Sequence, residues 1–418
     1  MKMEKIYCDN QSNTKMDEKV FEAMKPYFLE NFGNPQSVYS LGSVSKDAIE
    51  HAREQIASLI NADTREIIYT SCATESNNMA IKGIANSLKD KGRHIIVSAI
   101  EHFSVLNSAK RLEKEGFEVS FIGVDKQGNI KEDELKNALR KDTILVSIQY
   151  ANPEMGTIQD IKKLCSIVKK NSNALFHTDA VCACGTLPVD VKDLEIDALS
   201  FSASVLYGPK GAGALYLKKG IRIVPLFDGG IQENSKRAGT ENVPAIVGFG
   251  KACEIAKAEM SQNSAKMKVL RDTLIAELPK RIDYIYLNGA VDNRLSGNIN
   301  FSIEFVEGEA LFLLLDAKGI MAASGSACAS KDLKLSHVLT AMGVDTAVGQ
   351  GSIIFTLSKH NTKEDIDYIL EEFPKIVNRL RDMSPLYDYF QKTGKRKEAG
   401  PGTDYDHHDH EIENEDND

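Results

Sequence analysis

The sequence predicts an α/β protein with a mainly parallel sheet in a large first domain and a smaller α/β domain after it. From about residue 66, short apolar runs alternate with amphipathic helical segments, a pattern typical of parallel sheets covered on both faces. The chain has 418 residues, enough for two domains, and its 42% hydrophobic and 27% charged residues are ordinary for a globular protein. In such sheets, ligands bind beyond the carboxyl ends of the strands.

Six buried strands are predicted from runs rich in Ile, Val and Phe. The runs are EIIYTS, HIIVSAI, FEVSFIG, TILVSIQY, ALFHTDA and DALSFS, and helical segments such as ESNNMAIKGIANSLKD and SVLNSAKRLEKEG lie between them. A long helical stretch is expected from about 243 to 280. Beyond it, strands near YIYLNG, GNINFSIE and GSIIFTLS accompany helices around GEALFLLLDAKG and TKEDIDYILEEFPKIVNRLRDM. We expect a large domain over 1–255, a small one over 256–392 and a disordered acidic, histidine-containing tail over 393–418.

The charge distribution argues against nucleic-acid binding. The net charge is −9, but residues 403–418 hold eight acidic residues and no Lys or Arg, so the remaining body carries only −1. A nearly neutral body lacks the basic surface that nucleic acid requires. The sequence shows no signal-peptide pattern and no apolar run long enough to cross a membrane, so we expect a cytoplasmic protein without membrane contact. Seven cysteines without a regular spacing indicate free thiols.

A series of motifs in one order resembles the NifS/IscS-type cysteine desulfurases. The motifs are IYCDNQSNT, GNPQS, TSCATESNNMAIKG, AIEHFSV, ANPEMGTIQDI, FHTDA, SFSASVLYGPKGAGALY, GGIQENSKRAGTENVPAIVGFG and SGSACAS. This family belongs to the class V aminotransferases with the fold-type I architecture of pyridoxal-phosphate enzymes. The resemblance covers about residues 4–380. It implies a seven-stranded, mainly parallel sheet in the large domain and a homodimer with sites at the interface.

Six positions match residues that contact the cofactor in that family. The resemblance assigns phosphate contacts to Thr74, Ser202 and Thr240, the last across the dimer interface. It assigns ring contacts to the rest: Asp179 pairs with the pyridinium nitrogen, His102 stacks on the ring and Asn152 donates to the ring hydroxyl. Singly, such residues serve as helix caps or turn hydroxyls; together and in register, they indicate a cofactor cup.

Two departures from the family pattern bear directly on catalysis. The SFSA segment continues with Ser204 and Val205, where the family has histidine and the lysine that binds the cofactor covalently. Valine has no amine, and Lys210 is no substitute because family members carry it in addition. Ile354 stands where the family places the arginine that binds the substrate carboxylate. Asn234 and Ser235 also replace an Arg-Gly pair.

Three cysteines are candidates for sulfur or metal chemistry. Cys328, in SGSACAS, occupies the position of the family's nucleophilic thiol. Cys72 replaces a glycine before the phosphate turn, and Cys182 replaces a glutamine that faces the ring. One interpretation is that these three thiols ligate zinc or an iron–sulfur cluster. The other is that they are unrelated thiols that fill space in the fold.

The resemblance and its departures predict a desulfurase homologue that does not desulfurate cysteine. It would act through Cys328 in sulfur transfer or iron–sulfur assembly, with a scaffold or sulfur-acceptor protein as its partner. No covalent cofactor is expected, whereas non-covalent pyridoxal phosphate, a cluster and zinc all stay open. The alternatives are an active pyridoxal-phosphate-dependent desulfurase with a non-standard site and a structural or regulatory dimer partner.

Overall fold

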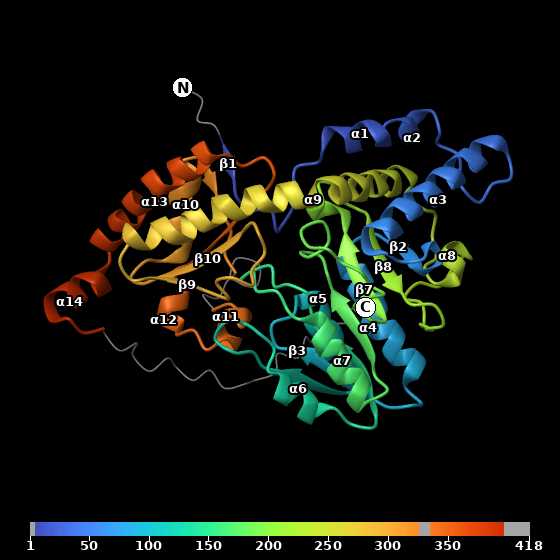
Figure 1. Cartoon of the computed structure of the whole chain (residues 1–418), viewed down its shortest axis with the longest axis horizontal. Coiled ribbons are helices and arrows are strands. Elements are labelled where there is room, and N and C mark those ends of the chain that lie inside the picture. Colours follow the sequence, from blue (N-terminus) through green and yellow to red (C-terminus); the bar gives the residue numbers. More distant parts are fainter. Residues whose placement is uncertain (1–4, 326–334, 397–418) are drawn as a thin grey trace, which may run out of the picture.

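One long helix joins two α/β halves of the protein. The structure, a computed structural model, describes residues 5–325 and 335–396. Helix α9 (Val243–Glu277) runs across both halves (Figure 1). Its first turns, including Phe249 and Cys253, belong to the core of the large half, and Leu270 and Leu274 belong to the core of the small half. This helix confirms the expected helical stretch from about 243 to 280. The predicted domain boundary between residues 255 and 256 lies inside it.

The large half is built on a seven-stranded sheet that is parallel except for one strand. In spatial order the strands are β2 (Ile67–Thr70), β8 (Gly213–Leu217), β7 (Ala198–Ser202), β6 (Leu175–Asp179), β5 (Thr143–Ser147), β3 (His94–Ser98) and β4 (Glu118–Ile122). Only β8 runs antiparallel to its neighbours. This confirms the predicted sheet and the six predicted strands, although β4 is an edge strand on which only Ile122 is buried. The seventh strand, β8, follows directly on the turn at Gly211.

Helices cover both faces of this sheet, because its strands carry apolar side chains on both sides. On β3, Ile95 and Val97 pack on the face covered by α4 (Ala73–Leu88) and α5 (Phe103–Lys114), whereas Ile96 packs on the opposite face. That opposite face is covered by α3 (Ser40–Ile60), α7 (Ile161–Asn171) and the start of α9. Because side chains alternate across a strand, a strand buried on both faces is a continuous apolar run. The remaining helices of this half are α1 (Glu18–Met24), α2 (Pro26–Leu29), α6 (Glu132–Ala138) and α8 (Gln232–Ser235).

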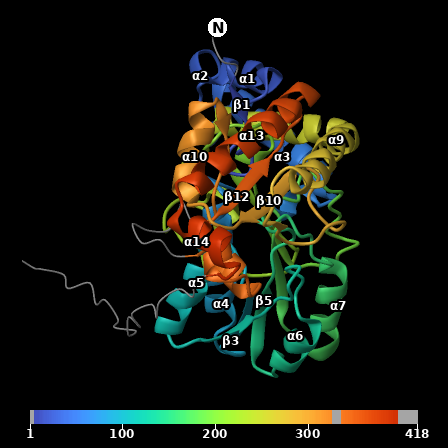
Figure 2. The ribbon, with the colours of Figure 1, turned by 90° about the vertical axis from the view of Figure 1, so that its left-hand side faces the viewer.

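The small half has its own antiparallel sheet and core. Its strands lie in the order β12 (Ser352–Thr356), β10 (Asn298–Ile303) and β9 (Ile285–Leu287), and α10 (Gly308–Ala317) and α13 (Lys363–Asp382) pack against them. Figure 2 shows these elements above the large sheet. The N-terminal strand β1 (Ile6–Tyr7) pairs with β11 (Ile320–Met321), so the chain starts in the small half. Short helices α12 (Thr346–Gly349) and α14 (Pro385–Thr393) complete it, whereas Val338 and Leu339 of α11 (His337–Ala341) belong to the core of the large half. No helix in the described ranges is long and apolar enough to cross a membrane.

A buried ion pair fixes the turn at α8 against the large sheet. Glu233, Asn234 and Ser235 all have positive φ, a conformation that costs non-glycine residues energy. The Glu233 carboxylate accepts two hydrogen bonds from Arg53 (2.8 and 2.9 Å) and one from the Tyr69 N–H (2.8 Å). Both ion-pair side chains are buried, at 11% and 4% exposure, and the guanidinium lies over the Tyr69 ring. The pair therefore stabilises a turn that its backbone alone disfavours.

We expect Arg53→Ala to lower the free energy of unfolding by about 3 kcal/mol, because removing one partner leaves a buried charge without compensation. Arg65→Ala is the matched control, since the Arg65–Asp63 pair is 75% and 46% exposed. It should change the free energy of unfolding far less than Arg53→Ala does. Urea denaturation of both variants measures the difference. Equal losses would show that the Glu233 pair does not hold the turn.

Candidate functional site

The predicted site residues converge on one cavity at the carboxyl ends of the parallel strands. The cavity has a volume of about 370 Å³. Its walls come from the segments that follow β2, β3, β5, β6 and β7, together with β12 of the small half. The predicted residues among its lining are Cys72, Thr74, His102, Asn152, Asp179, Cys182, Ser202, Val205 and Ile354. Thr240 is exposed and outside this lining, and Cys328 lies outside the described residues.

The N-terminus of α4 supplies the anion-binding end of the cavity. Cys72 is the N-cap in an extended conformation, and its side chain caps no backbone N–H. The uncapped first turn of a 16-residue helix attracts anions through its N–H groups and its dipole. A Cβ at Gly213 would lie 2.7 Å from the Cys72 carbonyl carbon, so glycine there lets β8 approach this turn closely. Ser202, at the end of β7, hydrogen-bonds Ser204 (3.2 Å) and the Ala212 carbonyl (3.3 Å).

Asp179 is the buried carboxylate at the floor of the cavity. Its Oδ2 accepts a hydrogen bond from the Asn77 amide (2.7 Å) and its Oδ1 from the Val181 N–H (3.0 Å). The residue is only 8% exposed, and burial raises the pKa of its carboxyl above the usual range. No ion pair to Asp179 is present within residues 5–325 and 335–396. A buried carboxylate in this state favours a ligand that brings a positive N–H donor.

His102 and Asn152 stand on the walls beside Asp179. His102 caps α5: its Nδ1 accepts from the Ser104 N–H at 3.1 Å. The Asn152 Oδ1 accepts from the N–H groups of Glu154 and Met155, both at 2.9 Å, and its amide donates to the Ile100 carbonyl at 3.0 Å. One amide hydrogen of Asn152 is therefore used internally, and the predicted donation to a ring hydroxyl depends on the other.

Val205 and Ile354 place apolar side chains in the cavity at the two positions where the family pattern has a lysine and an arginine. Val205 lies in a short 3-10 turn after β7, and Ile354 is 1% exposed on β12. Both line the cavity, which has no lysine or arginine among its described lining residues. Lys210 is not among those residues either. The prediction that Lys210 is no substitute for the lost lysine is consistent with this placement.

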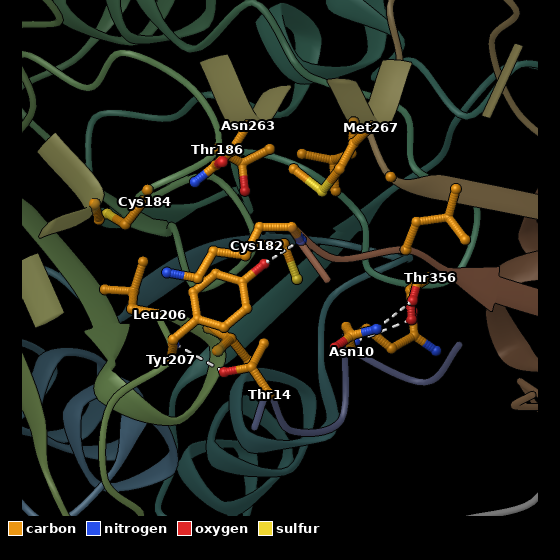
Figure 3. A pocket seen from close by; sticks show the side chains of 18 of the residues that line it. Asn10, Thr14, Cys182, Cys184, Thr186, Leu206, Tyr207, Asn263, Met267 and Thr356 are labelled. Carbon is orange, nitrogen blue, oxygen red and sulfur yellow. Dashed lines mark hydrogen bonds between the residues drawn. The ribbon is translucent and has the colours of Figure 1, made fainter. Parts of the chain in front are cut away.

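A second, smaller cavity of about 90 Å³, shown in Figure 3, adjoins the first. The two share a wall made by Gln11, Pro153, Val181, Cys182 and Val205. In Figure 3, Asn263 and Met267 of α9 face Asn10 and Thr14 of the N-terminal segment across this space. Burial, reinforced by Asp179, raises the pKa of the Cys182 thiol to about 12, so it is neutral at physiological pH.

Lys359 lines the second cavity but is already paired. Its ammonium contacts Asp17 at 2.7 Å and Glu259 at 3.2 Å, and it lies over the Tyr207 ring. These contacts tie the N-terminal segment to α9. The lysine is therefore held away from the first cavity as part of the connection between the halves.

The described part of the chain contains no complete set of metal ligands. There, no group of three or more His, Cys, Asp and Glu side chains could hold a metal ion. Cys72 and Cys182 line the same cavity without such a third partner, and the third predicted ligand, Cys328, lies outside the described residues. Zinc or a cluster at these cysteines stays a prediction.

Two buried acids and a histidine that line this cavity were not predicted from the sequence. Glu101 accepts from Ser98 (2.5 Å) and the Gln149 N–H (2.8 Å), and Glu154 accepts from Ser336 (2.6 Å). Burial raises the pKa of Glu101 to about 8 and that of Glu154 to about 7. His337 Nε2 donates to the Glu101 backbone carbonyl (2.9 Å), and its ring packs on Phe103. Glu101 comes directly after one predicted buried strand run, and Glu154 comes four residues after the end of another.

These residues fit a pyridoxal phosphate held without a covalent bond. The α4 N-terminus and Ser202 suit a phosphate, and the unpaired, buried Asp179 carboxylate suits a pyridinium N–H. No amine reaches the cavity from its described lining, so covalent attachment does not fit.

Comparisons with known proteins identify the family and the fold of the chain. The family model "Aminotransferase class-V" matches residues 6–369. The chain is 53% identical over 381 residues to cysteine desulfurase IscS of Methanosarcina thermophila, covering 91% of this chain and 94% of that protein. It is 51% identical to cysteine desulfurase IscS of Dictyoglomus turgidum, with 91% and 96% covered. A solved NifS-like protein superposes with a TM-score of 0.85 at 39% identity, over 90% of this chain and all of that one. A NifS-like protein from Rickettsia africae gives 0.81 at 33% identity, over 90% and 99%.

We expect Glu154→Gln to change how stability depends on pH. The folded pKa of about 7 exceeds the ordinary 4.5, so this acid's contribution is complete below pH 4.5 and is lost as pH rises through 7. The stability of the native protein relative to the variant should therefore fall by about 3 kcal/mol between pH 4.5 and 8. Urea denaturation across this range measures it, with the exposed Glu113→Gln as control. Parallel curves for all three proteins would contradict a buried neutral Glu154.

Proposed function

The chain belongs to the class-V aminotransferase family, and we propose that it serves sulfur transfer or iron–sulfur assembly without desulfurating cysteine itself. One observation carries the proposal: Val205 and Ile354 line the cavity, and no lysine or arginine accompanies them among its described residues. The similarity to proteins named cysteine desulfurase supports the sulfur-transfer role. The two replaced positions support the loss of the chemical step.

Bound pyridoxal phosphate supplies an electron sink for charge that develops at the substrate α-carbon. In this chain, the α4 N-terminus and Ser202 would bind its phosphate, and the Asp179 carboxylate would hold the pyridinium proton. His102 would pack on the ring. Val205 offers no amine to move a proton at the α-carbon. Ile354 offers a substrate carboxylate no hydrogen bond, so cysteine would lose a charge-assisted pair there.

Cys328 is the residue through which sulfur would pass. Its position in SGSACAS matches the nucleophilic thiol of the family, and thiols accept sulfur as thiolates. A persulfide delivered by a donor protein could be handed from Cys328 to an acceptor or an iron–sulfur scaffold, with no reaction at the cavity. The role proposed for Cys328 therefore does not require the lysine and the arginine that are missing at positions 205 and 354.

We propose that the protein acts as a homodimer. The N-terminal segment exposes several large apolar side chains, more than an isolated chain usually gathers in one region. They are Phe28 at 56%, Leu29 at 84%, Phe32 at 69% and Val38 at 100% exposure. A second copy that covered this region would also give exposed Thr240 the partner-side phosphate role that the family pattern assigns to it.

The two alternatives make different demands on the same residues. An active desulfurase with a non-standard site would release alanine from cysteine despite Val205. A structural or regulatory dimer partner would need no reactive Cys328. Each alternative is decided by one of the two experiments that follow.

We expect the native protein, incubated with pyridoxal phosphate and reduced with borohydride, to yield no stoichiometrically modified lysine in the pocket, as measured by peptide mass spectrometry. Val205→Lys should restore stoichiometric modification at residue 205. Alanine release from cysteine should be at least about tenfold faster in Val205→Lys/Ile354→Arg than in Val205→Lys, because a charge-assisted pair contributes about 1.5 kcal/mol or more. Alanine turnover by the native protein would favour the active desulfurase.

We expect Cys328 to react faster with a thiol reagent at neutral pH than the other six cysteines. Four of these are buried, and burial raises the thiol pKa, to about 12 for Cys165. Cys328→Ser should abolish persulfide loading from a donor protein while the native fold persists. Cys72→Ser, at a half-buried thiol, is the matched control and should leave loading unchanged. Slow labelling of Cys328, or normal loading in Cys328→Ser, would favour the structural alternative.

A further inference from the structure

Glu154 contacts two residues that flank Cys328 in the sequence. Its Oε2 accepts a hydrogen bond from the Ser336 hydroxyl at 2.6 Å, and Gly325 lies directly against the same carboxyl group. Cys328 follows Gly325 by three residues and precedes Ser336 by eight. Glu154 itself is only 7% exposed. One buried side chain therefore holds a residue on each side of the proposed sulfur carrier.

The glycine at 325 is required by this contact and not by the backbone. Its φ lies outside the left-handed region, so a residue with a side chain fits the local conformation. A Cβ there would lie 2.7 Å from Glu154 Oε2 and closer still to Oε1. An added methyl group therefore fits only if Gly325 or the carboxyl moves away.

The main chain of Glu154 is fixed on the side of the small half. Its N–H donates to Asn152 Oδ1 at 2.9 Å. Its carbonyl accepts from two side-chain amides of β10, Asn298 at 3.2 Å and Asn300 at 3.0 Å. These bonds leave the carboxyl little freedom to yield to a neighbour.

Ser336 joins the carboxyl to the large half. Its Oγ accepts from the Val338 N–H at 3.1 Å as the N-cap of α11, which leaves the hydroxyl hydrogen for Glu154. Val338 belongs to the core of the large half. The Glu154 carboxyl is therefore tied to buried, packed structure in both directions.

We propose that Glu154 is a positioning residue for Cys328. Its carboxyl holds the two flanking residues in place, and releasing either of them exposes the thiol to solvent in more arrangements of the chain. This inference rests on the proposed function, which gives Cys328 its sulfur-carrying role. It adds a buried group that controls how readily that thiol reacts.

Ionisation of the carboxyl makes this control depend on pH. Burial raises the pKa of Glu154 to about 7, opposed only by the Ser336 hydrogen bond, and no charged group of the described residues contributes. The polar side chains that contact Glu154, from its own turn, β10 and α11, are neutral: Asn152, Asn298, Asn300 and Ser336. An ionised carboxylate favours arrangements in which it reaches water. The contacts therefore weaken as pH rises through 7.

The rate at which iodoacetamide labels Cys328 in the full-length protein, followed by peptide mass spectrometry, tests the proposal. At pH 6, Ser336→Ala should raise this rate about fivefold, the equivalent of one hydrogen bond of about 1 kcal/mol. Ser336→Thr keeps the hydroxyl and the cap and should retain the native rate. The exposed Glu113→Gln is the control and should also label at the native rate.

Two further comparisons separate positioning from a general loss of structure. Gly325→Ala should raise the rate severalfold in the native background but add nothing in Glu154→Ala, where the methyl group enters the emptied space. Glu154→Gln should match the native protein at pH 6. Between pH 6 and pH 8 the native rate should rise more steeply than that of Glu154→Gln, because only the native carboxyl ionises.

Three results would overturn the inference: an unchanged rate in Ser336→Ala, an equal Gly325→Ala effect in both backgrounds, or parallel pH profiles for the native protein and Glu154→Gln. The Ser336 variants keep the test valid if Glu154→Ala fails to fold. Normal persulfide loading of Cys328→Ser from glutathione persulfide would instead overturn the proposed function. The labelling ratios decide the positioning role by themselves, since they compare one thiol between variants.

Discussion

The buried carboxylate of Asp179 organises the candidate site. The Asn77 amide on α4 and the Val181 N–H hold it, so the anion-binding helix and the end of β6 are positioned relative to each other. Around it, Glu101 and Glu154 add two more buried acids, whereas Val205 and Ile354 supply apolar surface at positions where the family pattern has cations. Electrostatic balance in this cavity must therefore come from a ligand or from protons.

Most of the fold could be predicted from the sequence because the sheet is buried on both faces. Runs such as HIIVSAI and TILVSIQY must be apolar on either side, and this makes them visible without structural information. The antiparallel strand β8 and the helices α1 to α3 were not among the predicted elements. The turn at α8 was also unforeseen in detail, since its positive φ values depend on an ion pair to Arg53, which lies 180 residues away in sequence. Such long-range partners leave no periodic pattern.

The site was predicted unevenly, for a similar reason. The residues that match family motifs, such as His102, Asp179 and Ser202, do line one cavity. Glu101 and Glu154 were missed because a charged residue in a sequence is normally exposed, and only the fold shows that these two are buried. The second cavity behind Cys182 and Val205 could not be predicted either, because it forms between the N-terminal segment and α9. It lies where the two halves meet, and it shares a wall with the first cavity.

The absence of a covalently held cofactor is the central claim, and the visible absorption spectrum of the protein tests it most directly. The protein would be purified without added metal, and spectra recorded before and after saturation with pyridoxal phosphate. We expect no band of lysine-bound cofactor in the purified protein and, after saturation, only the spectrum of the free aldehyde. A band of cofactor bound to a lysine, bleached by borohydride and retained on gel filtration, would contradict it.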